Sequence, residues 1–259
     1  MLNTLNISAE DIIRNIQLSC EIPEVLEAIA KQQIIAQTAS EAGITVSEEE
    51  LQQEGDNLRL EKKLVTAKDT WTWLKKHHLT LHDFEAIARN NVLSRKLAAH
   101  LFGKQVEKYF YEHYLDYVTT AIYEVILDDR DLALELFYAL QEGEITFQEI
   151  ARQYIQDPEL RCAGGYKGIQ TRKDLRPEIA AAVFAAKPPQ TIKPIVTSKG
   201  VYLIWVEEII QPELDENLHE KIRQELFSLW LKQQIETMEL VPQLIDTSPE
   251  RSEELRKQA

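Results

Sequence analysis

Proline and glycine are distributed very unevenly along this chain, and their distribution constrains its fold more than any other feature. Residues 24–157 contain no proline, the residue that breaks helices most strongly because it lacks an N–H donor and clashes with the preceding turn. Half of the eight glycines lie between Gly164 and Gly200. The sequence therefore predicts a long segment without strong helix breakers, followed by a compact segment rich in turns.

The first 118 residues have the pattern of successive amphipathic helices. After Pro23, apolar residues recur at spacings of three and four, which is the period of one helix face. Ser47 and Thr80 are each followed three residues later by an acidic residue, a pattern typical of a capped helix start. We therefore expect a layer of helices in this part of the chain.

Between residues 119 and 211 the pattern changes to short strands and short helices. The segment 122–127 is apolar and β-branched, which favours a strand. Two more strands are predicted at 192–196 and 201–210, with three short helices between the first strand and these two. The predicted order β-α-α-α-β-β is typical of an α+β unit whose helices pack against an antiparallel sheet.

One further helix is predicted after Pro212, and its apolar face needs a partner. The N-terminal helices are the most economical partner, which makes the middle unit an insertion. The predicted fold class is α+β, with a mostly helical N-terminal domain completed by a C-terminal helix. The predicted domains are residues 1–118 plus 212–247, the inserted residues 119–211, and a flexible charged tail at 248–259.

Charge and composition exclude several classes of partner. The chain has 259 residues and a net charge of −14, and a field of that sign repels phosphate backbones, so we expect no nucleic-acid partner. The longest apolar run, 179–186, is too short to span a membrane. The first six residues lack the basic and apolar regions of a secretory signal. We therefore predict a cytoplasmic protein without a membrane partner.

The thiol and imidazole groups give no sign of a metal or cofactor site. Cys20 and Cys162 are too few for a disulfide framework in a chain of this size. His77, His78 and His82 lie close together in the sequence, but no cluster of carboxylates or thiols accompanies them. We expect no metal and no cofactor.

Five short motifs follow one another between residues 121 and 208. They are a helix junction at 141–151, the loop from Asp157-Pro158 to Gly164-Gly165-Tyr166-Lys167-Gly168, a helix at 175–184, Lys187-Pro188-Pro189, and the segment 195–204. Together they resemble the parvulin-type peptidyl-prolyl cis/trans isomerases. The flanking segments 34–50 and 76–97, with the late helix, are similar to the helical chaperone domain of SurA-like and trigger-factor-like foldases.

The resemblance implies an isomerase that rotates X-Pro peptide bonds without covalent chemistry. It implies that Leu175, Ile179 and Phe184 form the apolar pocket for the proline ring, although core packing alone would also explain these residues. The catalytic polar residues would be Asp157, Tyr202 and Glu124. Tyr202 and Glu124 stand where the family usually has histidine, Asp157 could instead be a simple turn residue, and a carboxylate at Glu124 should raise the pKa of one of the two acids.

Basic residues gather in the loop that borders the implied site. Arg161, Lys167, Arg172, Lys173 and Arg176 lie there with one acid, Asp174. One interpretation is a cradle for acidic or phosphorylated peptide, with Arg172 and Lys173 as substrate-binding residues. The other is a solvated loop that balances nearby acids.

Two functions remain open at this point. The first is a peptidyl-prolyl isomerase and foldase whose partners are unfolded or precursor polypeptides containing proline. The second is a catalytically weak or inactive parvulin-like chaperone that holds or presents a precursor peptide. Loss of both family histidines favours the second, whereas a non-covalent mechanism leaves room for turnover without them.

Overall fold

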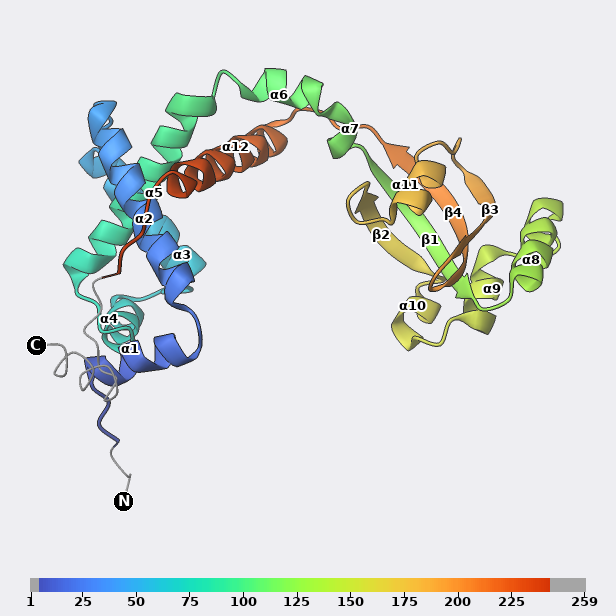
Figure 1. Cartoon of the computed structure of the whole chain (residues 1–259), viewed down its shortest axis with the longest axis horizontal. Helices are drawn as coiled ribbons and strands as arrows, with labels where there is room; N and C mark the ends of the chain where they lie inside the picture. Colours follow the sequence, from blue (N-terminus) through green and yellow to red (C-terminus); the bar gives the residue numbers. More distant parts are fainter. Residues whose placement is uncertain (1–4, 243–259) are drawn as a thin grey trace, which may run out of the picture. The chain divides into compact units, whose positions relative to one another are not determined.

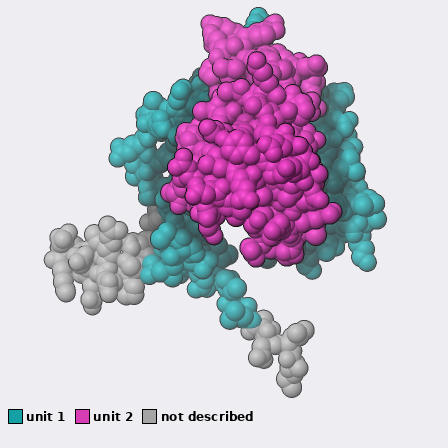
Figure 2. Space-filling view, turned by 90° about the vertical axis from the view of Figure 1, so that its right-hand side faces the viewer, with its two compact units in different colours: residues 1–106, 220–259 teal, residues 107–219 magenta. Residues whose placement is uncertain are grey.

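The computed structural model describes residues 5–242, which belong to two compact units. The first unit comprises residues 1–106 and 220–259, and the second comprises residues 107–219; the two are coloured separately in Figure 2. The domain limits predicted from the sequence, 119 and 211, both lie inside the second unit. The predicted tail at 248–259 lies outside the described residues.

The first unit is helical (Figure 1). Four of its helices begin with a capping box. In this motif a Ser or Thr hydroxyl accepts a hydrogen bond from the backbone N–H three residues later, and the acidic side chain of that later residue accepts one from the backbone N–H of the Ser or Thr. These caps are at Ser8, Ser47, Thr66 and Thr80. The helices are α1 (Ala9–Leu18), α2 (Ile22–Glu41), α3 (Glu48–Glu61), α4 (Ala67–Lys76), α5 (Leu81–Phe102) and, from residue 220 onward, α12 (Glu216–Glu236).

The core of this unit joins segments that are distant in the sequence. Phe227 and Leu231 of α12 pack with Ile34 of α2 and Leu97 of α5 in one buried cluster. A second cluster around Leu74 joins α3, α4 and α5. The late helix therefore completes the helical domain, as predicted, because its apolar face is buried only when the N-terminal helices cover it.

The second unit contains a four-stranded antiparallel sheet in the order β2-β1-β4-β3. Its strands are β1 (Thr119–Leu127), β2 (Tyr166–Thr171), β3 (Gln190–Thr197) and β4 (Gly200–Ile210). Its helices are, from residue 107 onward, α6 (Val106–Glu112), then α7 (Tyr114–Tyr117), α8 (Arg130–Glu142), α9 (Phe147–Tyr154), α10 (Pro158–Cys162) and α11 (Pro177–Val183). The observed fold class is α+β, as predicted.

Successive side chains of a strand point to opposite faces, so β4 contributes to two cores. Val201 and Leu203 join a cluster with residues of α8 and α9. Tyr202 and Ile204 join a different cluster with Ile179 of α11. The sheet is thus covered on both faces, and Tyr202 lies on the face that α11 covers.

The predicted order of elements was wrong in the turn-rich segment, where the structure adds β2 and the short helix α10. Strand β2 pairs only with β1, at the edge of the sheet. It contains Lys167 and Gly168, and all of its residues are exposed or half-buried. An edge strand of this kind does not alternate between apolar and polar residues, so its sequence predicts a loop.

Within residues 5–242, no helix combines the length and the apolar character needed to cross a bilayer.

Candidate active site

The residues predicted to hold a proline ring lie together on one face of the sheet. Ile179 and Tyr202 belong to the cluster that α11 covers, and Leu175 and Phe184 pack against this cluster while staying partly exposed. Ile179 is only 2% exposed and Tyr202 only 6%. Ile179 and Tyr202 therefore shape the base of an apolar surface, whereas Leu175 and Phe184 are the members that a ligand can reach.

Arg172 lies at the edge of this surface. Its guanidinium carbon is 4.3 Å from the centre of the Phe184 ring, a cation–π distance. Its Nε atom is buried and has no hydrogen-bond partner among the described residues. The guanidinium is therefore held beside the accessible ring with donor capacity left over.

Glu124 contributes a buried carboxyl group to the same face of the sheet. It lies opposite Ile204 in the β1–β4 pair, and directly paired residues share a face. Glu124 is 8% exposed, and its Oε1 is 3.7 Å from Nζ of Lys167. Burial raises the pKa of Glu124, and Lys167 opposes this only in part. The pKa is raised as expected, but the cause is burial, and Asp157 is not among the groups that act on it.

A β-bulge brings Lys167 to Glu124. In the β1–β2 pair, Ile122 lies opposite Gly168 and Tyr123 opposite Tyr166, so Lys167 has no partner in the ladder. Such an extra residue redirects a side chain at the edge of a sheet. Sequence reasoning missed this pair because β2 was not predicted, and only the strand register places the lysine beside the acid.

Gly165 allows the loop to approach Glu124 closely. Its carbonyl accepts the Glu124 backbone N–H at 2.9 Å. Its φ is +87°, and a Cβ added there would lie 3.0 Å from the Glu124 carbonyl oxygen. Glycine is the residue that adopts this conformation without strain, which gives a physical reason for the Gly164-Gly165 motif beside the site.

Two predicted site residues make their contacts elsewhere. Asp157 is exposed, and its Oδ1 accepts the Leu160 backbone N–H at 2.8 Å, so it caps α10. Lys173 is paired with Asp116, with 3.7 Å between Nζ and Oδ2. Six of the eight predicted residues therefore lie on one face of the sheet or at its edge: Glu124, Arg172, Leu175, Ile179, Phe184 and Tyr202. The observed contacts of Asp157 and Lys173 are a helix cap and an ion pair.

The remaining basic residues of the loop also have partners. Arg161 donates to the Ile155 carbonyl at 3.5 Å, and Nη1 of Arg176 donates to the Ser198 hydroxyl at 3.3 Å. Lys167 is paired with Glu124 and Lys173 with Asp116, so four of the five basic side chains form an ion pair or a hydrogen bond within the second unit. This favours a loop that balances nearby groups, with Arg172 as the basic residue most available to a ligand.

The second unit combines a four-stranded antiparallel sheet, an apolar surface under α11 and a glycine-rich edge beside Glu124. Residues 103–219 match the family model described as "PPIC-type PPIASE domain". This segment closely coincides with the second compact unit. This part of the chain belongs to that family.

The chain is also similar to proteins named as a foldase and as chaperones. The chain is 23% identical over 192 residues to the foldase protein PrsA of Caldanaerobacter subterraneus subsp. tengcongensis, a match that covers 74% of this chain and 58% of that protein. It is 30% identical over 95 residues to the chaperone SurA of Hydrogenovibrio crunogenus, covering 37% of this chain and 21% of the relative. The chain thus spans only part of the length of the relatives it matches.

Among solved structures, the chain is similar to the peptidylprolyl isomerase PrsA of Bacillus anthracis. The TM-score is 0.45 at 19% sequence identity, with 91% of this chain and 94% of that chain covered.

Proposed function

We propose that the chain is a peptidyl-prolyl cis/trans isomerase and foldase that acts on X-Pro bonds of polypeptide clients. The observation that carries the proposal is the combination, in a PPIC-type domain, of an accessible apolar surface at Leu175 and Phe184 with the guanidinium of Arg172 beside it. Apolar surface binds the proline ring, and a nearby donor can bind a carbonyl oxygen of the peptide.

Non-covalent groups of this kind are sufficient for the reaction. Rotation about a peptide bond faces a barrier of about 18–20 kcal/mol, because the planar amide is stabilised by resonance. Catalysis requires only that the site bind the twisted amide more strongly than the planar one. Twisting ends the resonance and returns the lone pair to the amide nitrogen, so the Arg172 guanidinium can stabilise the twisted bond by donating to that nitrogen. Glu124, whose protonated form is favoured by burial, places a polar group on the same face.

The missing family histidines do not remove these interactions. By the family resemblance Glu124 stands at the first histidine position and Tyr202 at the second, and both residues lie on the face of the sheet that α11 covers. Asp157 stays a predicted catalytic residue on the basis of the family resemblance, in addition to its observed role as a cap. The proposed site therefore has a carboxyl group and a phenol where the family pattern has two imidazoles.

A second function, the binding of unfolded polypeptides, is favoured by the helical unit. Relatives named as a foldase and as a chaperone align with this chain. We propose that clients are unfolded or precursor polypeptides containing proline. The cytoplasmic location stays a prediction, which fractionation of cells producing the chain would test.

Exchange spectroscopy on a series of X-Pro tetrapeptides tests the isomerase activity. We expect the full chain to accelerate cis/trans exchange, and Arg172→Ala to slow the accelerated rate by about tenfold or more, the effect of losing roughly 1.4 kcal/mol of transition-state binding. Lys173→Ala is the matched control, because Lys173 is the adjacent basic residue but is paired with Asp116.

Two results would contradict the proposal. If no peptide in the series exchanges faster with the wild-type chain, the isomerase function fails, and suppression of client aggregation would then support a chaperone without catalysis. If Arg172→Ala and Lys173→Ala slow exchange equally, Arg172 has no special position in the site. Including peptides with an acidic residue before proline also tests the interpretation of the basic loop as a cradle for acidic peptide.

A further inference from the structure

The helical unit contains an open groove between α3, α4 and α5. Its volume is about 590 Å³, within the range of about 300–1,000 Å³ typical of ligand sites. The apolar lining includes Leu51 of α3, Trp71 of α4, and Leu81 and Phe84 of α5. All of these residues belong to the first compact unit, so the groove is separate from the candidate active site in residues 107–219.

Large apolar side chains in this groove are left open to solvent. Trp71 is 60% exposed and Leu81 is 49% exposed. Gly55 also lines the groove, and a Cβ added there would lie 3.9 Å from the Phe84 ring, so no side chain of α3 covers the groove at this point. Aromatic surface presented in a concave site is typical of a binding position for an apolar group.

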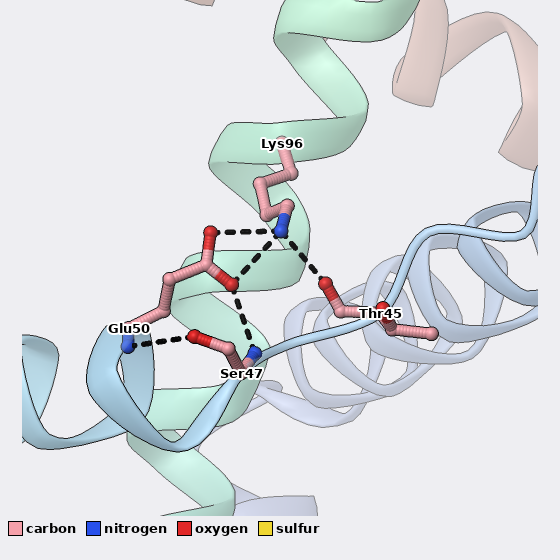
Figure 3. A network of polar contacts seen from close by, with 4 residues as sticks. All are labelled: Thr45, Ser47, Glu50 and Lys96. Atoms are coloured by element: carbon pink, nitrogen blue, oxygen red, sulfur yellow. Dashed lines mark hydrogen bonds and ion pairs between the residues drawn. The ribbon is translucent and has the colours of Figure 1, made fainter.

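Two polar networks hold α3 on α5. Glu50 of α3 accepts from Nζ of Lys96 through both carboxylate oxygens, at 2.7 and 2.8 Å, and the same Nζ donates to the Thr45 carbonyl at 2.8 Å (Figure 3). One turn further, Glu54 is buried and accepts from Asn91 and from Arg95. These ties hold two walls of the groove in place before any ligand binds, which reduces the entropy lost on binding.

The charged groups that line the groove are mostly acidic. Glu48, Asp56 and Glu85 are the acids, and Arg59 is the base. Arg59 lies 3.6 Å from Asp56, between Nη1 and Oδ1, which leaves Glu48 and Glu85 as the excess charge. The Nε atom of Arg59 is buried and has no hydrogen-bond partner in the part of the chain that the structure describes. The Arg59 side chain as a whole is 37% exposed, so the terminal nitrogens of its guanidinium, and not Nε, are the donors that a backbone carbonyl of a bound peptide can reach.

We propose that this groove binds a segment of an unfolded polypeptide in which an apolar or aromatic side chain is flanked by lysine or arginine. The apolar side chain packs on Trp71 and Leu81, the flanking cations face Glu48 and Glu85, and the terminal guanidinium nitrogens of Arg59 donate to the peptide backbone. The net charge of −14 adds long-range attraction for a basic segment. The site deepens the client-binding part of the proposed function and does not depend on isomerase activity.

Fluorescence anisotropy with the full chain and two labelled, proline-free peptides tests the proposal. The peptides share a Leu-Phe-Leu centre and carry either lysines or glutamates on both sides. We expect the lysine peptide to bind at least tenfold more tightly, and its binding to weaken as salt is added. Equal affinity for the two peptides would overturn the proposal.

Two pairs of variants locate the binding. Trp71→Ala should weaken binding of the lysine peptide at least tenfold, whereas Leu60→Ala, which removes another exposed apolar side chain (79% exposed) outside the groove lining, should change it less than twofold. Glu85→Lys should abolish the preference for lysine, whereas Glu239→Lys, an exposed acid outside the lining, should preserve it. If Trp71→Ala and Leu60→Ala bind equally, or both charge variants keep the preference, the groove is not the site.

Isomerase assays on the same variants separate this proposal from the previous one. Because Trp71 and Glu85 lie in the helical unit, both variants should accelerate exchange of a proline tetrapeptide as the wild-type chain does. Glu85 is exposed, so its charge reversal tests the groove even if Trp71→Ala does not fold. A chain without isomerase activity that still prefers the lysine peptide would support the groove and contradict the isomerase function.

Discussion

At the scale of single residues, Glu124 makes stability depend on pH. Burial raises its pKa above the ordinary value of 4.5, so between 4.5 and the raised value the folded chain holds a proton that the unfolded chain has released. The free energy of unfolding therefore falls as pH rises through that interval. The stability is fully present below pH 4.5 and is lost above the raised pKa.

Glu124→Gln should remove this dependence, because the amide mimics the protonated acid. We expect the variant to have a higher free energy of unfolding than the wild type at neutral pH, and the difference to shrink below pH 4.5. Urea unfolding followed across a pH series measures both curves. A Gln variant that is less stable at neutral pH would mean that the ion pair with Lys167 outweighs the burial of the carboxylate.

Asp157 has both a predicted catalytic role and an observed capping role, and two substitutions separate them. Asp157→Ala should lower the free energy of unfolding by about 1 kcal/mol through loss of the cap, and Asp157→Asn by only a few tenths, since its oxygen can accept the same bond. Chemical unfolding measures this difference. The exchange rate of the Asn variant then isolates the charge: a slower rate supports catalysis, and an unchanged rate assigns the residue to the cap alone.

At the scale of elements, the contact between α3 and α5 depends on the buried carboxylate of Glu54. Glu54→Ala should lower the free energy of unfolding by about 1.5–3 kcal/mol, because it removes two charge-assisted bonds and leaves the Asn91 amide without its acceptor. Gln53→Ala, an exposed position on the same helix, is the control. Equal unfolding curves for the two variants would show that the tie does not stabilise the helix pair.

Elements with strong local signals were predicted well, and the edge strand was not. The Ser47 and Thr80 caps identify helix starts because the signal lies within one turn of the chain. Strand β2 has no such signal, since its partner in β1 is more than 40 residues away in the sequence and none of its own residues is buried. Its existence depends on pairing, which local patterns do not encode.

At the scale of the whole molecule, a helix near the C-terminus completes a domain that begins near the N-terminus. Leu231→Ala in α12 should lower the stability of the helical unit by about 2–5 kcal/mol, because it leaves a cavity beside Ile34 and Leu97. Hydrogen exchange measures the effect by region. We expect lost protection in α2, α5 and α12 and unchanged protection in β1 and β4; a loss centred on the sheet would contradict this assignment of the core.

The sequence by itself determined the helix starts, the class of the inserted domain and the apolar residues that gather under α11, because each depends on spacing within a short stretch. Only the tertiary structure decided what those residues touch. Strand register brought Lys167 to Glu124, and the packing of three helices formed the groove beside Trp71. Such contacts join residues far apart in the chain, and their energies depend on burial and distance, which exist only after the chain has folded.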